Sequence, residues 1–462
     1  MALLALISCC LTVARATAAP SLCVLALEQE CFALFGPPCR ECANSSPRAK
    51  HFCTPPLVAS ACATKVVAAA QPAPTLKLST ARRNIGAVAT ATTAYFAGGC
   101  VTQGKSVQFV CNNASAAIDA FDVAAGRVVA AKADPKRVLA EARGWVAAGY
   151  ASAGSGSVVF AGGGTLGTAP HSRRADVLDV ATGAMSTNAT ALSVGRWGIG
   201  WASTEREVFF TGGKVTISGY TDAFMTASVD VFEALPAPGH FRLAPFNLSQ
   251  ARESNQAAIV GGSLLVAGGW AKLGGKYQGS ARVDVFDQAT KAGHLVKNSH
   301  FDLKSDAYDV GLASMRAPGA AFELAYLADN ENLLVLNEKG VALATIPLPA
   351  HMVGAGGQII GGGTIPAAHV AHNGVSIGGV LACFYSLRLT KAHVHSKAVA
   401  HSEVLCYSVP EQRWHALNCS VPHQGGQIVA LNGTHILVGG GYDPTSEVEA
   451  TTDVVDVFRV SV

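Results

Sequence analysis

The sequence predicts an all-β protein whose main body is a closed β-propeller of four-stranded sheets. Three observations predict this fold. An opening pattern, Leu-x-x-small-Arg, occurs four times along the chain, each copy leads through two short apolar strands to a glycine pair, and each pair is followed by an alternating strand that begins with aspartate. A fixed sequence period of this kind is typical of repeat architectures, in which neighbouring units share a core.

The repeated unit is expected to contain four antiparallel strands. The arginine of the opening pattern lies 16, 19, 16 and 16 residues before the first glycine of the pair. The strands after the pairs alternate with period two, as half-buried strands do. A fourth strand is clearest where Trp414 follows Tyr407. The opening patterns are Leu78–Arg82, Leu139–Arg143, Leu192–Arg196 and Leu248–Arg252, the glycine pairs are Gly98-Gly99, Gly162-Gly163, Gly212-Gly213 and Gly268-Gly269, and the alternating strands begin at Asp119, Asp176, Asp230 and Asp284.

These units resemble kelch repeats, which have a hydrophobic strand ending in Gly-Gly, a tyrosine in the third strand and a tryptophan in the fourth. The resemblance covers about residues 75–462. It implies sheets that hide both apolar faces by stacking radially against their neighbours. The chain departs from the family because Phe or Leu usually replaces the tyrosine, and only the unit around Trp414 keeps the tryptophan.

Seven blades are expected, with six as the alternative. A fifth unit spans 308–348 without a glycine pair, and the sixth and seventh both open with GGQI, at Gly356 and Gly425. An Ala/Gly/His-rich stretch, 361–374, interrupts the sixth unit. The last unit stops after its third strand, so we expect the segment Thr75–Ser79 to supply the missing outer strand by pairing with residues 453–460.

The N-terminus predicts export from the cell. Residues 1–18 combine an apolar run with small residues at Ala16 and Ala18, which is typical of a signal peptide cleaved after Ala18. A retained apolar anchor is the alternative. No later segment reaches about 18 uninterrupted apolar residues. We therefore expect a secreted, extracellular protein without a membrane span in the mature chain, divided into a cysteine-rich module (19–65) and the propeller (66–462).

Cysteine spacing predicts a small disulfide-rich module ahead of the propeller. Its pairing is left open by the sequence, and its CxxC motif could instead bind zinc, although disulfides are favoured in a secreted segment. In the propeller, Cys100 is expected to pair with Cys111 and Cys383 with Cys406, which leaves Cys419 free or paired elsewhere. The module's cysteines are Cys23, Cys31, Cys39, Cys42, Cys53 and Cys62.

Sequons and histidines mark further candidate sites. His393 and His395 would share one face of a strand, a spacing that metal ions accept. No carboxylate or cysteine set accompanies the late histidines, so we expect a solvated loop between the second and third strands, and no metal site. The late histidines are His369, His372, His393, His395 and His401. The candidate N-glycosylation sites are Asn44, Asn113, Asn188, Asn247, Asn418 and Asn432.

Composition and loop placement favour a binding scaffold. The net charge of +3 is spread without basic blocks, which argues against a nucleic-acid partner. The loops after the glycine pairs are long and emerge on one face, and loops on a rigid scaffold often carry binding residues. We therefore expect recognition of a protein or glycan through these loops, without a cofactor. The oligomeric state and the ligand are not determined by the sequence.

The enzymatic alternative is a copper-radical oxidase. Some secreted kelch-like propellers resemble oxidases of the galactose oxidase type, and that resemblance implies two tyrosines, two histidines and a cysteine cross-linked to tyrosine. The adjacent Tyr-His pair expected in that family does not occur in this sequence. Neither do the HExxH and Asp-box patterns, and no catalytic residue is assigned.

Overall fold

The structure is a computed structural model, and the strands that it describes begin at Ala68. It describes residues 68–461 except for 102–110, 112, 125–126, 132–133, 165–170, 189, 217–223, 237–238, 288–297, 304–309, 317–322, 330–331, 350–357, 361–362, 366–367, 391–398, 410–411 and 444–450. The expected signal peptide (1–18) and cysteine-rich module (19–65) therefore lie outside the described residues.

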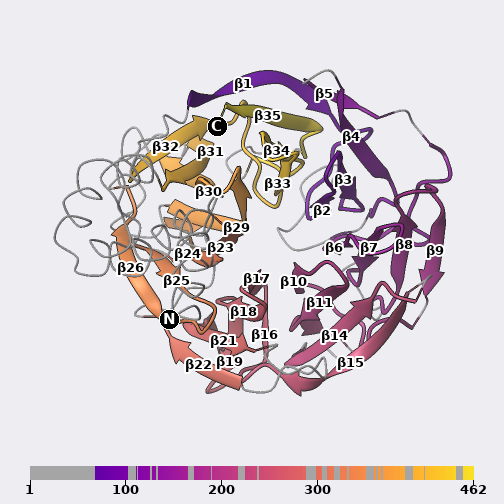
Figure 1. The fold of residues 1–462 in the computed structure, drawn as a ribbon, viewed down its shortest axis with the longest axis horizontal. Coiled ribbons are helices and arrows are strands. Elements are labelled where there is room, and N and C mark those ends of the chain that lie inside the picture. Colours follow the sequence, from indigo (N-terminus) through magenta and orange to yellow (C-terminus); the bar gives the residue numbers. More distant parts are fainter. Residues whose placement is uncertain are drawn as a thin grey trace, which may run out of the picture.

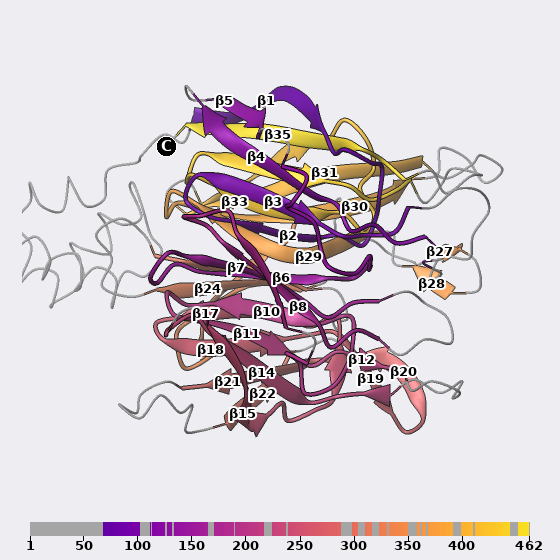
Figure 2. The ribbon, with the colours of Figure 1, turned by 90° about the vertical axis from the view of Figure 1, so that its right-hand side faces the viewer.

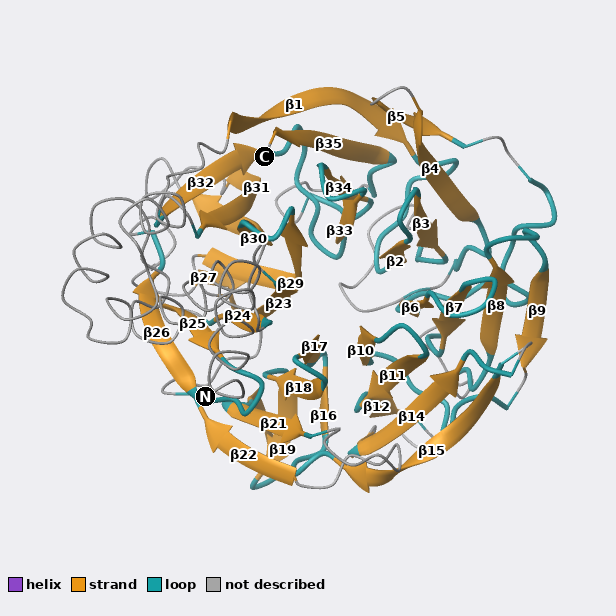
Figure 3. Ribbon diagram, viewed as in Figure 1, coloured by secondary structure: helices purple, strands orange, loops and turns teal. Residues whose placement is uncertain are grey.

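The described residues form an all-β structure in which seven antiparallel sheets have four strands each. We number these sheets I to VII along the chain. Figure 1 shows them arranged radially around a common centre, and Figure 3 shows no helix in the described part. No helix among these residues is long and apolar enough to cross a membrane.

The strands of sheets I to IV follow one another outward from the centre. In hydrogen-bonded order they are β2 (Gly86–Ala89), β3 (Thr93–Ala97), β4 (Ile118–Ala124) and β5 (Arg127–Ala130) in sheet I; β6 (Ala147–Ala151), β7 (Ser157–Ala161), β8 (Ala175–Asp179) and β9 (Met185–Asn188) in sheet II; β10 (Gly200–Ser203), β11 (Glu207–Thr211), β14 (Ser228–Glu233) and β15 (His240–Asn247) in sheet III; and β17 (Gln256–Val260), β18 (Ser263–Ala267), β21 (Arg282–Phe286) and β22 (Asn298–Asp302) in sheet IV.

Sheets V to VII repeat this order, except that the outer strand of sheet VII comes from the start of the described chain. Their strands are β23 (Gly311–Met315), β24 (Leu324–Ala328), β25 (Asn332–Leu336) and β26 (Ala342–Pro347) in sheet V; β29 (Ala368–Ile377), β30 (Leu381–Thr390), β31 (Val399–Ser408) and β32 (Arg413–Asn418) in sheet VI; and β33 (Gln427–Leu431), β34 (His435–Gly439), β35 (Val454–Ser461) and β1 (Ala68–Lys77) in sheet VII. Sheet V confirms the predicted fifth unit.

The core lies between neighbouring sheets. The second strands β7 and β18 are buried along their whole length, whereas the outer strand β9 is mostly exposed. The apolar clusters extend across adjacent sheets: one joins sheets II and III, for example, and another joins sheets VI and VII. The innermost strands contact each other in a closed ring, β2 to β6, β10, β17, β23, β29, β33 and back to β2. Each sheet thus buries both faces against its neighbours.

The ring is closed by the two ends of the described chain. Strand β1 pairs antiparallel with β35, with Lys77 opposite Val454 and Ala68 opposite Ser461. This pairing confirms the prediction that the segment before the first repeat supplies the outer strand of the last sheet. Leu76 packs there into the apolar cluster that sheets I and VII share.

The opening of the sixth unit differs from the prediction. Residues of the GGQI pattern at Gly356 form β27 (Gln358–Ile360), which pairs with β28 (Gly363–Ile365) in a separate hairpin. The first strand of sheet VI is instead β29, because the Ala/Gly/His-rich stretch pairs with β30 around an irregularity between Val370 and Gly374. The GGQI pattern at Gly425 does lead into β33.

The predicted histidine loop is also wrong for most of its length. His369 and His372 lie on β29, and His401 lies on β31, which pairs with β30 over ten residues. This long pairing converts the expected loop into strand. His393 and His395 lie outside the described residues.

Short additional strands gather at one end of the molecule. They are β12 (Lys214–Val215), which pairs with β13 (Phe224–Met225); β19 (Trp270–Leu273), which pairs with β16 (Arg252–Glu253) and β20 (Lys276–Gly279); and the β27–β28 hairpin. Figure 2 shows β12, β19, β20, β27 and β28 at the same end. Strands β12 and β19 begin directly after the glycine pairs at Gly213 and Gly269, so this end is the predicted loop face.

Candidate functional site

A buried ion pair stands at the equivalent place in each of sheets I to IV. In sheet II, Arg143 Nη2 lies 2.7 Å from Asp176 Oδ2, with both side chains at most 1% exposed. The guanidinium also donates to the carbonyl of Phe160 on the second strand. The arginine is the last residue of the opening pattern, and the aspartate lies on the third strand. The equivalent pairs are Arg82–Asp119 (2.5 Å), Arg196–Asp230 (2.6 Å) and Arg252–Asp284 (2.8 Å).

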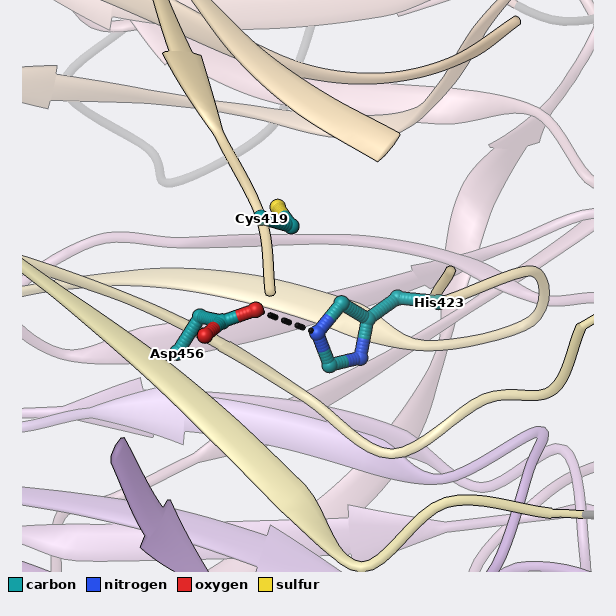
Figure 4. A group of neighbouring side chains, drawn as sticks. All are labelled: Cys419, His423 and Asp456. Carbon is teal, nitrogen blue, oxygen red and sulfur yellow. Dashed lines mark hydrogen bonds and ion pairs between the residues drawn. The ribbon is translucent and has the colours of Figure 1, made fainter. Parts of the chain in front are cut away.

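Sheet VII replaces this pair with histidine and aspartate. His423 Nε2 lies 3.0 Å from Asp456 Oδ2, and His423 Nδ1 donates to the carbonyl oxygen of Gly440 at 2.5 Å. Cys419 lies beside them, with all the ligand atoms of the three residues within 4.8 Å of one another. Figure 4 shows the imidazole facing the carboxylate across this hydrogen bond. Among the described residues, this is the only group of three or more His, Cys, Asp and Glu side chains placed to hold a metal ion.

The residues after the repeat arginine link neighbouring sheets on the loop face. Two positions after the arginine, Asn84 and Trp145 adopt left-handed backbone conformations, with φ of 54° and 53°. The amide of Trp145 donates to the carbonyl of Asn84, and the amide of Asn84 donates to that of Gly425. The position just before this turn residue lies beside the loops: Trp197, one residue after Arg196, forms an antiparallel bridge with Lys214.

Aromatic and charged side chains meet around Trp197. Its ring centroid lies 5.2 Å from that of Trp145 and 6.1 Å from that of His171. Lys214 Nζ lies 5.3 Å from the Trp197 centroid and 5.0 Å from that of Tyr277. The same ammonium lies 3.6 Å from Glu253 Oε1. We call these residues the Trp197 cluster: Trp145, His171, Trp197, Lys214, Glu253 and Tyr277.

Three buried polar atoms of the cluster have no hydrogen-bond partner among the described residues. They are Trp197 Nε1, Glu253 Oε2 and His171 Nδ1. Leaving such an atom buried and unpaired costs about 1–3 kcal/mol, so a cluster of them indicates a place where a ligand or water completes the bonding. A Cβ at Gly164 would lie 3.0 Å from His171 Nδ1, so this glycine leaves space beside one of them.

Burial changes the ionisation of the two titratable groups on either side of Lys214. It raises the pKa of Glu253 to about 7, although the Lys214 ammonium opposes this rise. It lowers the pKa of His171 to about 4, and Lys214 contributes in the same direction. Near neutral pH the carboxyl group can therefore donate or accept a hydrogen bond, while the imidazole is neutral. His171 Nε2 also lies 2.8 Å from Thr216 Oγ1.

The cluster offers two kinds of contact at once. The faces of Trp145, Trp197 and Tyr277 provide apolar area, with Trp145 and Trp197 partly exposed and Tyr277 46% exposed. The unpartnered atoms provide an indole donor, a carboxyl oxygen and an imidazole nitrogen. A ligand with hydroxyl groups on an apolar frame matches this set, because a hydroxyl both donates and accepts.

The cysteines predicted to pair within the propeller do so. Cys100 and Cys111 form one disulfide, and Cys383 and Cys406, opposite each other on β30 and β31, form a second. Cys419 has a free thiol. The six cysteines assigned to the N-terminal module lie outside the described residues.

Five of the six sequon asparagines lie in the described part of the chain, and all five are exposed. The sixth, Asn44, lies outside it. The exposed asparagines are Asn113, Asn188, Asn247, Asn418 and Asn432.

Sequence reasoning did not find the Trp197 cluster. One signal was available, because Trp197 and Glu253 each follow directly after a repeat arginine. His171 and Lys214 come from loops after glycine pairs, and no sequence period places them. No protein-family model matches this chain, and neither does any curated protein.

Proposed function

We propose that this chain is a secreted, N-glycosylated propeller of the kelch type, with seven blades, that binds a glycan through the Trp197 cluster. The observation that carries the proposal is the placement of unpartnered buried polar atoms beside partly exposed aromatic rings. Aromatic side chains present an apolar face with little loss of conformational freedom, and fixed polar groups beside them give a site its specificity. A protein ligand on the same loop face is the alternative.

Three features support the remaining parts of this proposal. Seven four-stranded sheets surround one centre, and the glycine pairs end their second strands in sheets I to IV and VII. Disulfides are typical of extracellular proteins, and this chain has two in its described part. Exposed sequon asparagines are accessible to a glycosyltransferase.

Binding of the purified secreted protein to a glycan array tests the proposal. We expect binding to a restricted set of glycans, and a loss of about tenfold or more in Trp197→Ala, because the substitution removes both a ring face and a donor. Trp414→Ala is the matched control. Trp414 lies on the outer strand of sheet VI and donates to the Pro347 carbonyl, so its loss should leave binding unchanged. Equal affinities of the wild type and Trp197→Ala, or no glycan bound at all, would contradict the proposal.

A further inference from the structure

We propose that Cys419, His423 and Asp456 bind one divalent transition-metal ion in sheet VII, and that zinc fits these ligands best. This site is separate from the Trp197 cluster and does not depend on the proposed function. The proposal begins from what the same three positions hold in the other sheets.

The equivalence of these positions is structural. In sheet I, the amide of Ser79, which follows Leu78, donates to Asp119, the partner of Arg82. In sheet VII, the amide of Ser420, which follows Cys419, donates to Asp456 in the same way. Sheets II, III and IV repeat the bond with the amides of Ala140, Ser193 and Ser249 on Asp176, Asp230 and Asp284. Cys419 therefore takes the leucine position and His423 the arginine position.

Both replacements change the chemistry in one direction. Leucine and arginine cannot ligate a metal ion under ordinary conditions, whereas cysteine and histidine are the usual ligands of zinc. The aspartate is the one member that all five sheets keep. Cysteine in place of leucine, and histidine in place of arginine, thus convert an apolar contact and an ion pair into a set of one sulfur, one nitrogen and one oxygen ligand.

The geometry is close to that of a tetrahedral site. With bonds of about 2.0–2.3 Å, tetrahedral ligand atoms lie roughly 3.3–3.8 Å apart. His423 Nε2 and Asp456 Oδ2 are already 3.0 Å apart, and no pair of ligand atoms in the group exceeds 4.8 Å. A side-chain rotation of Cys419 that moves its sulfur by about 1 Å is enough to close the set.

The surroundings hold the imidazole in the orientation that ligation requires. A metal-bound histidine usually donates its other ring N–H to a carbonyl or carboxylate. Here His423 Nδ1 donates to the Gly440 carbonyl, which leaves Nε2 directed at Asp456. The His423 amide donates to the hydroxyls of Tyr385 and Ser402, so the backbone is fixed as well.

The charges around the thiol favour a cation. The carboxylates of Asp456 and Glu403 lie close enough to the Cys419 thiol to act on it electrostatically. In sheets I to IV an arginine guanidinium accompanies the aspartate, and no arginine stands at that position in sheet VII. A dication would stabilise the thiolate and the carboxylate together. Cys419 is partly exposed.

Cobalt(II) replaces zinc in such sites and reports thiolate ligation through a charge-transfer band. We expect the purified full-length protein, after chelation and dialysis, to bind one equivalent of cobalt with such a band, and zinc to abolish the band. The control is the double variant Cys419→Leu/His423→Arg. It restores the residues of sheets I to IV and should therefore fold, with no band and no zinc-dependent rise in melting temperature, whereas the wild type shows both.

Three outcomes would overturn the proposal. One is the absence of a cobalt–thiolate band in wild-type protein, and a second is a band that persists unchanged in the double variant, since that signal would come from other cysteines. The third is the absence of a free thiol at Cys419 after unfolding under non-reducing conditions. In each case His423 and Asp456 form only a structural ion pair.

Discussion

Arg196 Nη1 lies 2.6 Å from Asp230 Oδ2 in an ion pair whose side chains are 0% and 2% exposed. The same arginine donates to the carbonyls of Phe210 and Gly212 on the second strand and at its end. One side chain thus connects the opening turn, the second strand and the third strand of sheet III. The pair recurs in sheets I, II and IV, so it is part of the repeat itself.

Loss of this arginine should destabilise the protein strongly. Arg196→Met leaves the Asp230 carboxylate buried without its partner, and breaking a buried pair in this way costs about 3–5 kcal/mol. Urea denaturation measures the free energy of unfolding. Arg206→Met, at an exposed position in the turn between β10 and β11, is the control and should change this free energy by no more than about 0.5 kcal/mol. A cost below about 1 kcal/mol for Arg196→Met would show that the pair is not needed for stability.

Ring closure should depend on the apolar face of β1. Leu76 packs between sheets I and VII, so Leu76→Asp places a charge in that apolar seam and should lower the free energy of unfolding by about 2–4 kcal/mol. Thr75→Asp adds the same charge at the neighbouring exposed position and should have an effect of about 0.5 kcal/mol or less. Thermal and urea unfolding of both variants provide the comparison. Equal stability of the two would mean that β1 contributes little to closing the ring.

The Trp197 cluster should give the protein a specific dependence on pH. The folded-state pKa of Glu253 lies at about 7, above the ordinary value for a carboxyl group, so the folded protein binds the extra proton more tightly. Its contribution to stability is fully present below pH 4.5 and is lost as the pH rises to 7, a change on the order of 3 kcal/mol. His171 has a folded-state pKa of about 4, so its contribution runs the other way and stability increases between pH 4 and 6.5.

Single variants separate these opposing contributions. The free energy of unfolding of the wild type minus that of Glu253→Gln should fall between pH 4.5 and 7, because the variant lacks the titrating carboxyl group. The same difference for His171→Asn should rise between pH 4 and 6.5. Urea unfolding at half-unit steps of pH measures both differences, and all other titrating groups cancel. Two flat differences would be inconsistent with the buried state of these side chains.

Most of the fold could be predicted because the same short sequence patterns recur along the chain. The opening pattern, the glycine pairs and the alternating strands recur at similar spacing. The last repeat contains only three strands, which predicted that the segment before the first repeat supplies the fourth. The unit between Gly356 and Ser408 was harder to predict. Its GGQI pattern matches that at Gly425, yet a hairpin forms there, because the following histidine-rich stretch pairs better with the long strand β30.

The role of the repeat arginine does not follow from the sequence alone. Arg143 and Asp176 were both identified as repeat positions, 33 residues apart, and the sequence does not show which distant partner a buried arginine takes. In sheet VII, Cys419 and His423 stand where the opening pattern has leucine and arginine, so that pattern does not mark the start of this unit. The side chains of the Trp197 cluster come from the turns and loops of three different sheets. They meet because the ring places these sheets side by side.

The way the ring closes also constrains how the protein is made. Lys77 and its partner Asp453 are 376 residues apart in sequence, so the segment Ala68–Lys77 leaves the ribosome long before the strand that it pairs with. At typical synthesis rates the interval is roughly 20–75 s, during which β1 lacks the strand that it pairs with. Because an unpaired strand edge attracts other chains, a nascent molecule of this kind benefits from chaperones until strand β35 emerges.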